Sequence, residues 1–240
     1  MIYINFKINK KYLINFLLGN TNNFSCEKYQ KDIIKFQNLA RERSSTIYKF
    51  LTGWALPSDI NKRNLDYVSE KLKKYYYDLE NKQIFQKLYN QTKKYKKFCK
   101  LQREENFKKS YNIIKNLSWF SPKGKYFVYI THPGIKNWQY LWKNQIQWWN
   151  KELFENYTTI YLWHEIMHSY FGNSNIEHSI IQFICDEELR IRLNWWKYPP
   201  FVGHLELYEL MEQMLPYWKK YLRTKNKNIY EFLNNMRGLF

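Results

Sequence analysis

The chain has 240 residues, of which 45% are hydrophobic and 20% aromatic, and its formal net charge is +18. This apolar content is enough for a core, so the composition excludes a disordered chain. With only 7 Gly and 6 Pro, it also argues against a turn-rich all-β sandwich or barrel. The positive charge fits an anionic partner, but it equally fits the Lys-, Asn-, Ile- and Tyr-rich coding of an AT-rich genome.

The cysteines and the apolar segments bear on where the protein resides. Cys26, Cys99 and Cys185 are far apart and form no C-x-x-C pair, which argues against a disulfide framework and fits a reducing compartment. The apolar run near the N-terminus is interrupted by Asn15, and no typical cleavage site follows it. No apolar stretch approaches the length that a bilayer crossing needs. We therefore expect a cytoplasmic protein without a membrane segment.

The first half of the chain, residues 1–120, is predicted to be a mostly helical and basic region. Residues 2–8 alternate apolar with polar side chains, as a half-buried strand does. Apolar spacing predicts two helices between residues 26 and 56, then a break at Pro57 and a largely helical stretch over residues 60–117.

A lysine-rich run lies within that helical stretch. Between Lys93 and Lys100 the chain carries five lysines interleaved with Tyr95 and Phe98. A surface that binds nucleic acid through lysines and stacking aromatics has this composition. The solvated face of an amphipathic helix with buried aromatics has it too. We expect at most a weak anionic partner at residues 93–100.

Residues 121–240 are predicted to form the second region, unless the whole chain is one continuous domain. A turn at residues 121–124 precedes an aromatic and β-branched strand at residues 125–130. The Trp-rich segment 138–149 is expected to be helix or packed loop. Later helices are expected at about residues 160–171, 176–193 and 205–222. A few strands among many helices predict an α+β fold that is predominantly helical.

The segment His164-Glu165-Ile166-Met167-His168 has the form H-E-x-x-H. On a helix, residues four apart share one face, so the two imidazoles can converge on one metal ion. Glu165 would then lie close enough to act on a metal-bound water. Thr158 or Thr159 is the expected N-cap of this helix, and Gly172 is its expected stop. The segment therefore predicts two ligands of a metal site.

A catalytic zinc usually has three protein ligands, so a third ligand is expected downstream. Glu187 and Glu188 follow His168 by 19 and 20 positions, on the helix predicted over residues 176–193. A helical wheel places Glu187 within an apolar arc, where a carboxylate needs a cation. His178, ten residues after His168, is a further alternative.

These residues resemble the gluzincin branch of zinc metallopeptidases, in which an H-E-x-x-H helix is followed about twenty residues on by a Glu ligand. The resemblance covers residues 158–193 and implies Zn²⁺ held by His164, His168 and Glu188, with Glu187 kept as an alternative. It also implies that Glu165 is the general base. The metzincin pattern is excluded, because it needs Gly and His where the chain has Phe171 and Ser174.

The resemblance further implies a zincin-like core with a small sheet, and a peptide or protein substrate held along an edge strand, for which residues 125–130 are the candidate. Arg192 stands where one gluzincin group has an Asp that orients a ligand His. That role would pass to Asp186 or to a backbone carbonyl.

The predicted function is a zinc-dependent metallopeptidase. The alternative is a basic protein that binds nucleic acid or another anion, with an inactive or coincidental H-E-x-x-H motif. Side chains that could stabilise a transition state are not ranked by the sequence; they are Tyr161, Tyr170, His178, His204 and Tyr208, with His132 as a further imidazole.

Overall fold

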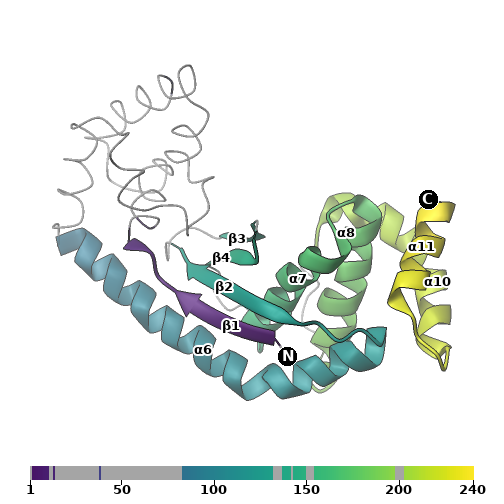
Figure 1. The fold of residues 1–240 in the computed structure, drawn as a ribbon, viewed down its shortest axis with the longest axis horizontal. Coiled ribbons are helices and arrows are strands. Elements are labelled where there is room, and N and C mark those ends of the chain that lie inside the picture. The colour runs from purple at the N-terminus through teal and green to yellow at the C-terminus, as the bar shows by residue number, and fades with distance from the viewer. Residues whose placement is uncertain are drawn as a thin grey trace. The chain divides into compact units, whose positions relative to one another are not determined.

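The computed structural model describes residues 2–10, 13, 38, 83–131, 137–141, 143–149, 154–197 and 203–240. These residues are mainly helical and include one small mixed sheet (Figure 1). This confirms the predicted α+β class with a predominance of helix. The two helices expected between residues 26 and 56, apart from residue 38, and the break at Pro57 lie outside the described residues.

Four strands form the sheet, in the order β1-β2-β4-β3. They are β1 (Ile2–Lys7), β2 (Gly124–Ile130), β3 (Asn137–Tyr140) and β4 (Gln145–Trp149). β2 runs parallel to β4, and β3 runs antiparallel to β4. The strands predicted at residues 2–8 and 125–130 are thus confirmed. Because β2 has a neighbour on each side, the expectation that it forms an edge strand is wrong.

The Trp-rich segment 138–149 forms the β3–β4 hairpin, so the prediction of helix or packed loop is wrong. Lys143 and Asn144 both have φ of 55° at the turn. Positive φ in a hairpin turn is usually provided by Gly, Asn or Asp. Here Lys-Asn fills the turn without a glycine. The sequence therefore lacked the strongest local signal for a hairpin.

The helices follow the predicted order with shifted ends. The long α6 (Gln83–Ser118) confirms the helix expected over the described part of residues 60–117, and α7 (Tyr157–Phe171) carries the H-E-x-x-H segment. The helix expected at 176–193 is continuous but changes type along its length, through the elements α8 (Asn175–Ile181), the π-helix η2 (Gln182–Leu189) and α9 (Arg190–Leu193).

The C-terminal residues form the short 3₁₀ turn η3 (Leu205–Leu207) and two helices, α10 (Tyr208–Arg223) and α11 (Ile229–Leu239). Trp218 and Tyr221 of α10 contact Phe232 of α11, with ring centroids 5.6 and 4.9 Å apart. α11 was not predicted from the sequence, although Asn228 caps it by accepting from two backbone N–H groups. Among the described residues, no helix combines the length and apolar character that a membrane crossing requires.

The chain divides into two compact units that interleave along the sequence. One unit contains Met1–Tyr3, Cys99–Tyr126 and Glu152–Phe240, and the other contains Ile4–Phe98 and Phe127–Lys151. The sequence suggested a boundary near residue 120, or else one continuous domain. All of α7 to α11 belongs to the first unit, so the H-E-x-x-H segment lies wholly within it.

α7 is the central helix of that first unit, and every residue from Tyr157 to Met167 is buried. A helix that is buried on all sides belongs to the core. The Trp163 ring stacks on Phe107 of α6 with centroids 5.9 Å apart, and its Nε1–H donates to Ser110 Oγ at 2.9 Å. These contacts fix the rotation of α7 about its axis.

The N-terminus of α7 is held by amide side chains and not by the predicted threonine caps. The capping residue is Asn156, with φ of 64°. Its Oδ1 accepts from Asn106 at 2.9 Å, and its Nδ2 donates to Asn194 at 2.8 Å. Gln102 Oε1 accepts from the N–H of Thr159 at 3.2 Å. Asn tolerates the left-handed conformation better than Thr does, which explains why the cap lies earlier than predicted.

Candidate metal centre

The two histidines of the motif lie one turn apart on α7. Their ring centroids are 5.0 Å apart. His164 is buried, whereas His168 is half-buried. The pair therefore places two imidazoles on a helix that is mostly buried in the core. The motif therefore brings its two imidazoles together as predicted.

A third imidazole, His178, comes from α8. Its ring lies 4.7 Å from that of His168 and 5.0 Å from that of His164, and its Nε2 lies 3.0 Å from His164 Nε2. Among the described residues, these three histidines form a group whose ligand atoms all lie within 4.8 Å of one another. Zn–N bonds of about 2.0–2.1 Å separate two tetrahedral ligands by roughly 3.3 Å. The cluster therefore fits a metal ion of this size.

Hydrogen bonds on the far side of two rings fix their orientation. The Nδ1–H of His164 donates to the carboxylate of Asp186, with distances of 3.0 and 3.2 Å to its two oxygens. The Nδ1–H of His168 donates to the carbonyl oxygen of Gly172 at 2.9 Å. Both bonds leave Nε2 with its lone pair toward the cluster. Histidines that bind metals are usually oriented in this way, and the two partners confirm the expectation of Asp186 or a backbone carbonyl.

Burial keeps these imidazoles in the neutral form that binds a metal. It lowers the pKa of His164 to about 3 and that of His168 to about 4. Burial also lowers the pKa of His178 to about 3, and the neighbouring imidazoles lower it further. A charged imidazole here would lose hydration and meet the charge of its neighbours. At neutral pH, protons therefore compete weakly for the three nitrogens.

Asp186 is the buried carboxylate that supports the site, with 2% of its surface exposed. Burial raises its pKa, and the positive charge of Arg190 opposes that rise. Arg190 is itself only 1% exposed and also lies 3.9 Å from Glu187. A buried carboxylate needs hydrogen bonds or a cation nearby, and Asp186 has both in His164 and Arg190.

Glu188, which the sequence favoured as third ligand, is not in the group of clustered ligand atoms that His164, His168 and His178 form among the described residues. Its Oε2 accepts from Arg192 at 2.7 and 2.9 Å. Glu187, the alternative, lies beside Arg190. Both glutamates are in η2, whose π-helical turns are wider than those of the α-helix assumed in the helical wheel. His178 therefore replaces Glu188 in the ligand set that the geometry supports.

Glu165, the expected general base, is buried with 4% of its surface exposed. Burial raises the pKa of the Cys185 thiol, and the nearby carboxylates of Asp186 and Glu165 raise it further. Glu165 thus lies close to Cys185 of η2. It follows His164 directly in the motif, and a carboxylate is a residue type suited to proton exchange at such a cluster.

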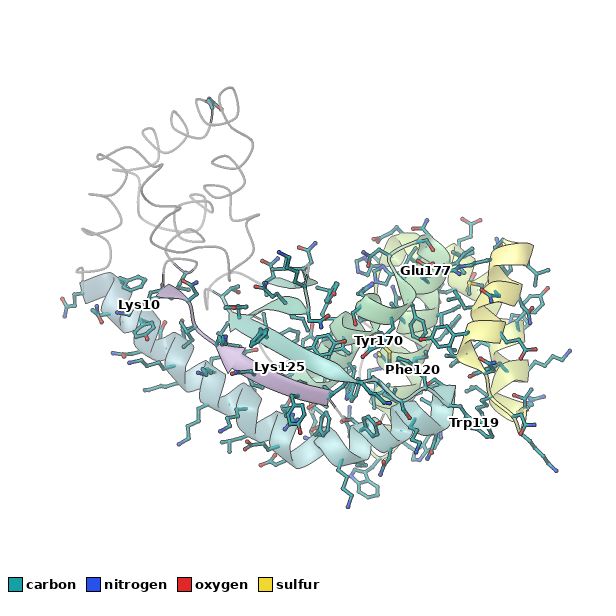
Figure 2. The ribbon with its side chains drawn as sticks, viewed as in Figure 1. Lys10, Trp119, Phe120, Lys125, Tyr170 and Glu177 are labelled. Atoms are coloured by element: carbon teal, nitrogen blue, oxygen red, sulfur yellow. The ribbon has the colours of Figure 1, made fainter. Side chains whose placement is uncertain are left out.

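A tight turn between α7 and α8 sets the distance between the ligands. Gly172 has φ of 102°, and its carbonyl is the one that orients His168. Glu177 closes the turn by accepting from the N–H of Ser174 at 2.9 Å and by pairing with Arg237 of α11. Figure 2 labels Glu177 on α8. The turn lets His168 and His178 meet across a short stretch of chain.

The C-terminal end of α7 is anchored by aromatic and backbone contacts. Phe120 lies edge-on against Tyr170, with centroids 4.6 Å apart (Figure 2). The N–H of Lys123 donates to Tyr170 Oη at 2.9 Å, and Tyr126 Oη and Ser169 Oγ are 2.6 Å apart. These contacts hold the turn of α7 that carries His168.

A fourth imidazole, His204, lies next to the cluster. Its ring centroid is 4.4 Å from that of His178, and its Nδ1 lies 2.7 Å from Glu206 Oε1. The side chain is about half exposed. Of the other candidate donors, Tyr161 is buried and Tyr170 binds Lys123, while Tyr208 is exposed. His132 lies outside the described residues.

Comparison with known proteins found no matching family model, no matching curated protein and no matching solved structure. The gluzincin resemblance therefore stays a prediction from the motif. The three-histidine cluster is argued from the geometry of this chain alone.

Replacing either candidate third ligand should distinguish His178 from Glu188. We expect His178→Ala to lower zinc affinity by more than the roughly 10–100-fold loss typical of supporting partners. Glu188→Gln should leave the affinity unchanged, because Glu188 pairs with Arg192. Competition with a chromophoric chelator measures both. A loss in Glu188→Gln alone would restore Glu188 as the ligand.

Gly172→Ala tests whether the turn positions His168. An added Cβ would lie 2.5 Å from Glu177 Oε2, at a φ of 102° that side chains rarely adopt. We expect a loss of about 1–3 kcal/mol in the free energy of unfolding, together with weaker zinc binding. The measurements are urea unfolding and chelator competition. Gly238→Ala is the matched control, since a Cβ there meets nothing within 4 Å. Equal effects of the two variants would contradict the role of Gly172.

Proposed function

We propose that this protein is a zinc-dependent metallopeptidase, with His164, His168 and His178 as the metal ligands and Glu165 as the general base. The observation that carries the proposal is the convergence of three imidazoles on the motif helix, two of them oriented by Asp186 and Gly172. The choice of peptide substrates comes from the H-E-x-x-H motif and not from the fold.

Zinc suits this donor set. Imidazole binds zinc well, although copper, nickel and iron also accept it. Three protein ligands leave one coordination position open, as catalytic zinc sites require. Bound zinc would supply Lewis acidity and lower the pKa of a water ligand toward about 7.

Glu165 performs the proton transfers in this proposal. Its carboxylate takes a proton from the attacking water, holds it, and delivers it to the leaving amine. Its burial favours this role, because a base shielded from bulk water holds the proton until the amine leaves. The Asp186 carboxylate keeps the Nδ1 proton on His164 throughout the reaction.

His204 is the group that best fits a contact with the substrate. Protonated on both nitrogens, its ring donates Nδ1–H to Glu206 and keeps Nε2–H as the donor of a second hydrogen bond. It lies beside His178 yet is about half exposed. In this proposal the His204 ring stabilises the negative charge that develops on the substrate carbonyl oxygen.

The wider assignments belong to the same proposal. The zincin-like core that the resemblance implies is one of them. Three sparse cysteines favour a reducing compartment, and we propose the cytoplasm.

Glu165→Gln tests the enzymatic proposal directly. Glutamine keeps the size of the side chain but cannot accept the proton, so zinc affinity should be retained while peptide hydrolysis falls by about 10²–10⁴-fold. Mass spectrometry of cleavage products from a peptide pool measures the rate, and Glu212→Gln on the exposed face of α10 is the control. Wild-type protein without stoichiometric zinc, or an unchanged rate in Glu165→Gln, would refute the proposal.

His204→Ala tests the proposed substrate contact. We expect kcat to fall by about 10²–10³-fold, as for loss of one oxyanion donor, with zinc affinity unchanged. Tyr208→Phe is the control, because Tyr208 is 53% exposed and is the alternative donor nearest in sequence. If His204→Ala lowers zinc affinity as much as His178→Ala, then His204 is a metal ligand and not a substrate contact.

A further inference from the structure

The N-terminal part of α6 exposes a strongly basic surface. No acidic residue occurs between Gln83 and Arg103, while lysines recur along that stretch. The exposed residues between positions 86 and 98 are Gln86, Lys87, Asn90, Gln91, Lys93, Lys94, Lys97 and Phe98. The opposite side of the helix is buried through Phe85, Leu88 and Thr92. The packing needs of the helix are thus met without this surface.

An aromatic ring stands among these lysines. Phe98 is 41% exposed, and its ring stacks on Tyr95 with centroids 6.0 Å apart and planes 24° apart. Tyr95 is fixed in turn, because its hydroxyl accepts from Trp148 Nε1 at 2.9 Å. Phe98 therefore presents an apolar ring to solvent from a fixed support, with Lys94 one turn before it on the same side of the helix.

Further positive charge gathers at the preceding turns. Lys93 Nζ lies 4.5 Å from the centre of the Tyr89 ring, and Lys10 Nζ lies 5.2 Å from it. Figure 2 labels Lys10 beside the start of α6. Lys87 and Lys94 are two turns apart, which is about 10.5 Å along the helix axis. The positive charge of the lysines thus extends along the helix axis as a stripe.

We propose that this basic α6 face, defined by Lys87, Lys93, Lys94, Lys97 and Phe98, binds single-stranded nucleic acid. The lysines neutralise successive phosphates, and an unpaired base stacks on the Phe98 ring. Surfaces that bind single strands combine these two elements. The bases of a duplex are stacked on each other and do not reach a ring in this way.

A membrane surface fits the same face less well. Helices that lie in a membrane interface need a broad apolar face, with several large apolar side chains inserted. Between positions 86 and 98 the exposed side is polar except for Phe98, because the apolar side of α6 is already buried in the protein. Phosphates with accessible bases are the better match.

Fluorescence anisotropy of a labelled 16-nucleotide oligo(dT), titrated with the full-length chain at several salt concentrations, tests the lysines. The double variant Lys94→Gln with Lys97→Gln should make the negative slope of log K against log salt less steep by about 1.4, which is 0.7 for each lost phosphate contact. Lys219→Gln with Lys220→Gln on α10 removes the same charge from another exposed site and should leave the slope unchanged. Equal losses in both double variants would overturn the proposal.

Phe98→Ala tests the stacking contact. We expect oligo(dT) affinity to fall by about 5- to 150-fold, the effect typical of one stacked base. Phe98→Trp should retain affinity, which guards against a folding defect in the alanine variant. Tyr217→Ala is the matched control, because Tyr217 is 42% exposed on α10. Unchanged binding in Phe98→Ala would overturn the proposal.

Two further measurements separate this proposal from its rivals. Binding to a duplex of the same length as tightly as to the single strand would overturn it. So would binding to phosphatidylserine vesicles without binding to oligo(dT). The proposal is independent of the metal centre, so Glu165→Gln and zinc removal should leave oligonucleotide binding unchanged.

Discussion

A buried imidazole and a buried carboxylate, those of His164 and Asp186, meet at 3.0 Å between α7 and η2. Each group needs the other in the core, because a buried polar group left without its hydrogen-bond partner typically costs about 1–3 kcal/mol. Arg190 adds a positive charge close to the carboxylate. The requirement to keep these groups together fixes α7 and η2 against each other. The orientation of His164, the first candidate metal ligand, follows from that.

The three candidate ligands lie close in sequence, whereas their support comes from further away. His164, His168 and His178 belong to two helices joined by the Gly172 turn, so a short piece of chain creates the cluster. The orientation of His164 depends on Asp186, and the turn is held by Arg237 of α11 through Glu177. Packing of the unit therefore arranges the ligands before any metal binds. This preorganisation reduces the ordering cost of binding.

The sequence predicted the parts of the site that depend on local pattern. The H-E-x-x-H helix, its end at Gly172 and the helix that follows were all recognised from spacing and stop signals. His178 was recognised only as a further alternative, because the spacing of the gluzincin resemblance favoured Glu188 as the third ligand. Glu188 forms an ion pair with Arg192, four residues later, and this pairing competes with binding of a metal by Glu188. The motif alone does not show that pairing. The β3–β4 hairpin was missed because its turn lacks glycine.

Replacing a glutamate ligand by His178 changes the charge balance of the proposed centre. Three neutral imidazoles leave the charge of a divalent ion unneutralised, whereas a carboxylate ligand would halve it. The balancing negative charge must then come from carboxylates that do not touch the ion, and Asp186 and Glu165 are the buried ones beside the motif. Asp186 acts through the His164 ring, so its ionised form is favoured when that ring carries positive charge. Glu187 and Glu188 pair with arginines and contribute no negative charge to the proposed ligand set. A metal ion bound by three neutral imidazoles would therefore be more electrophilic.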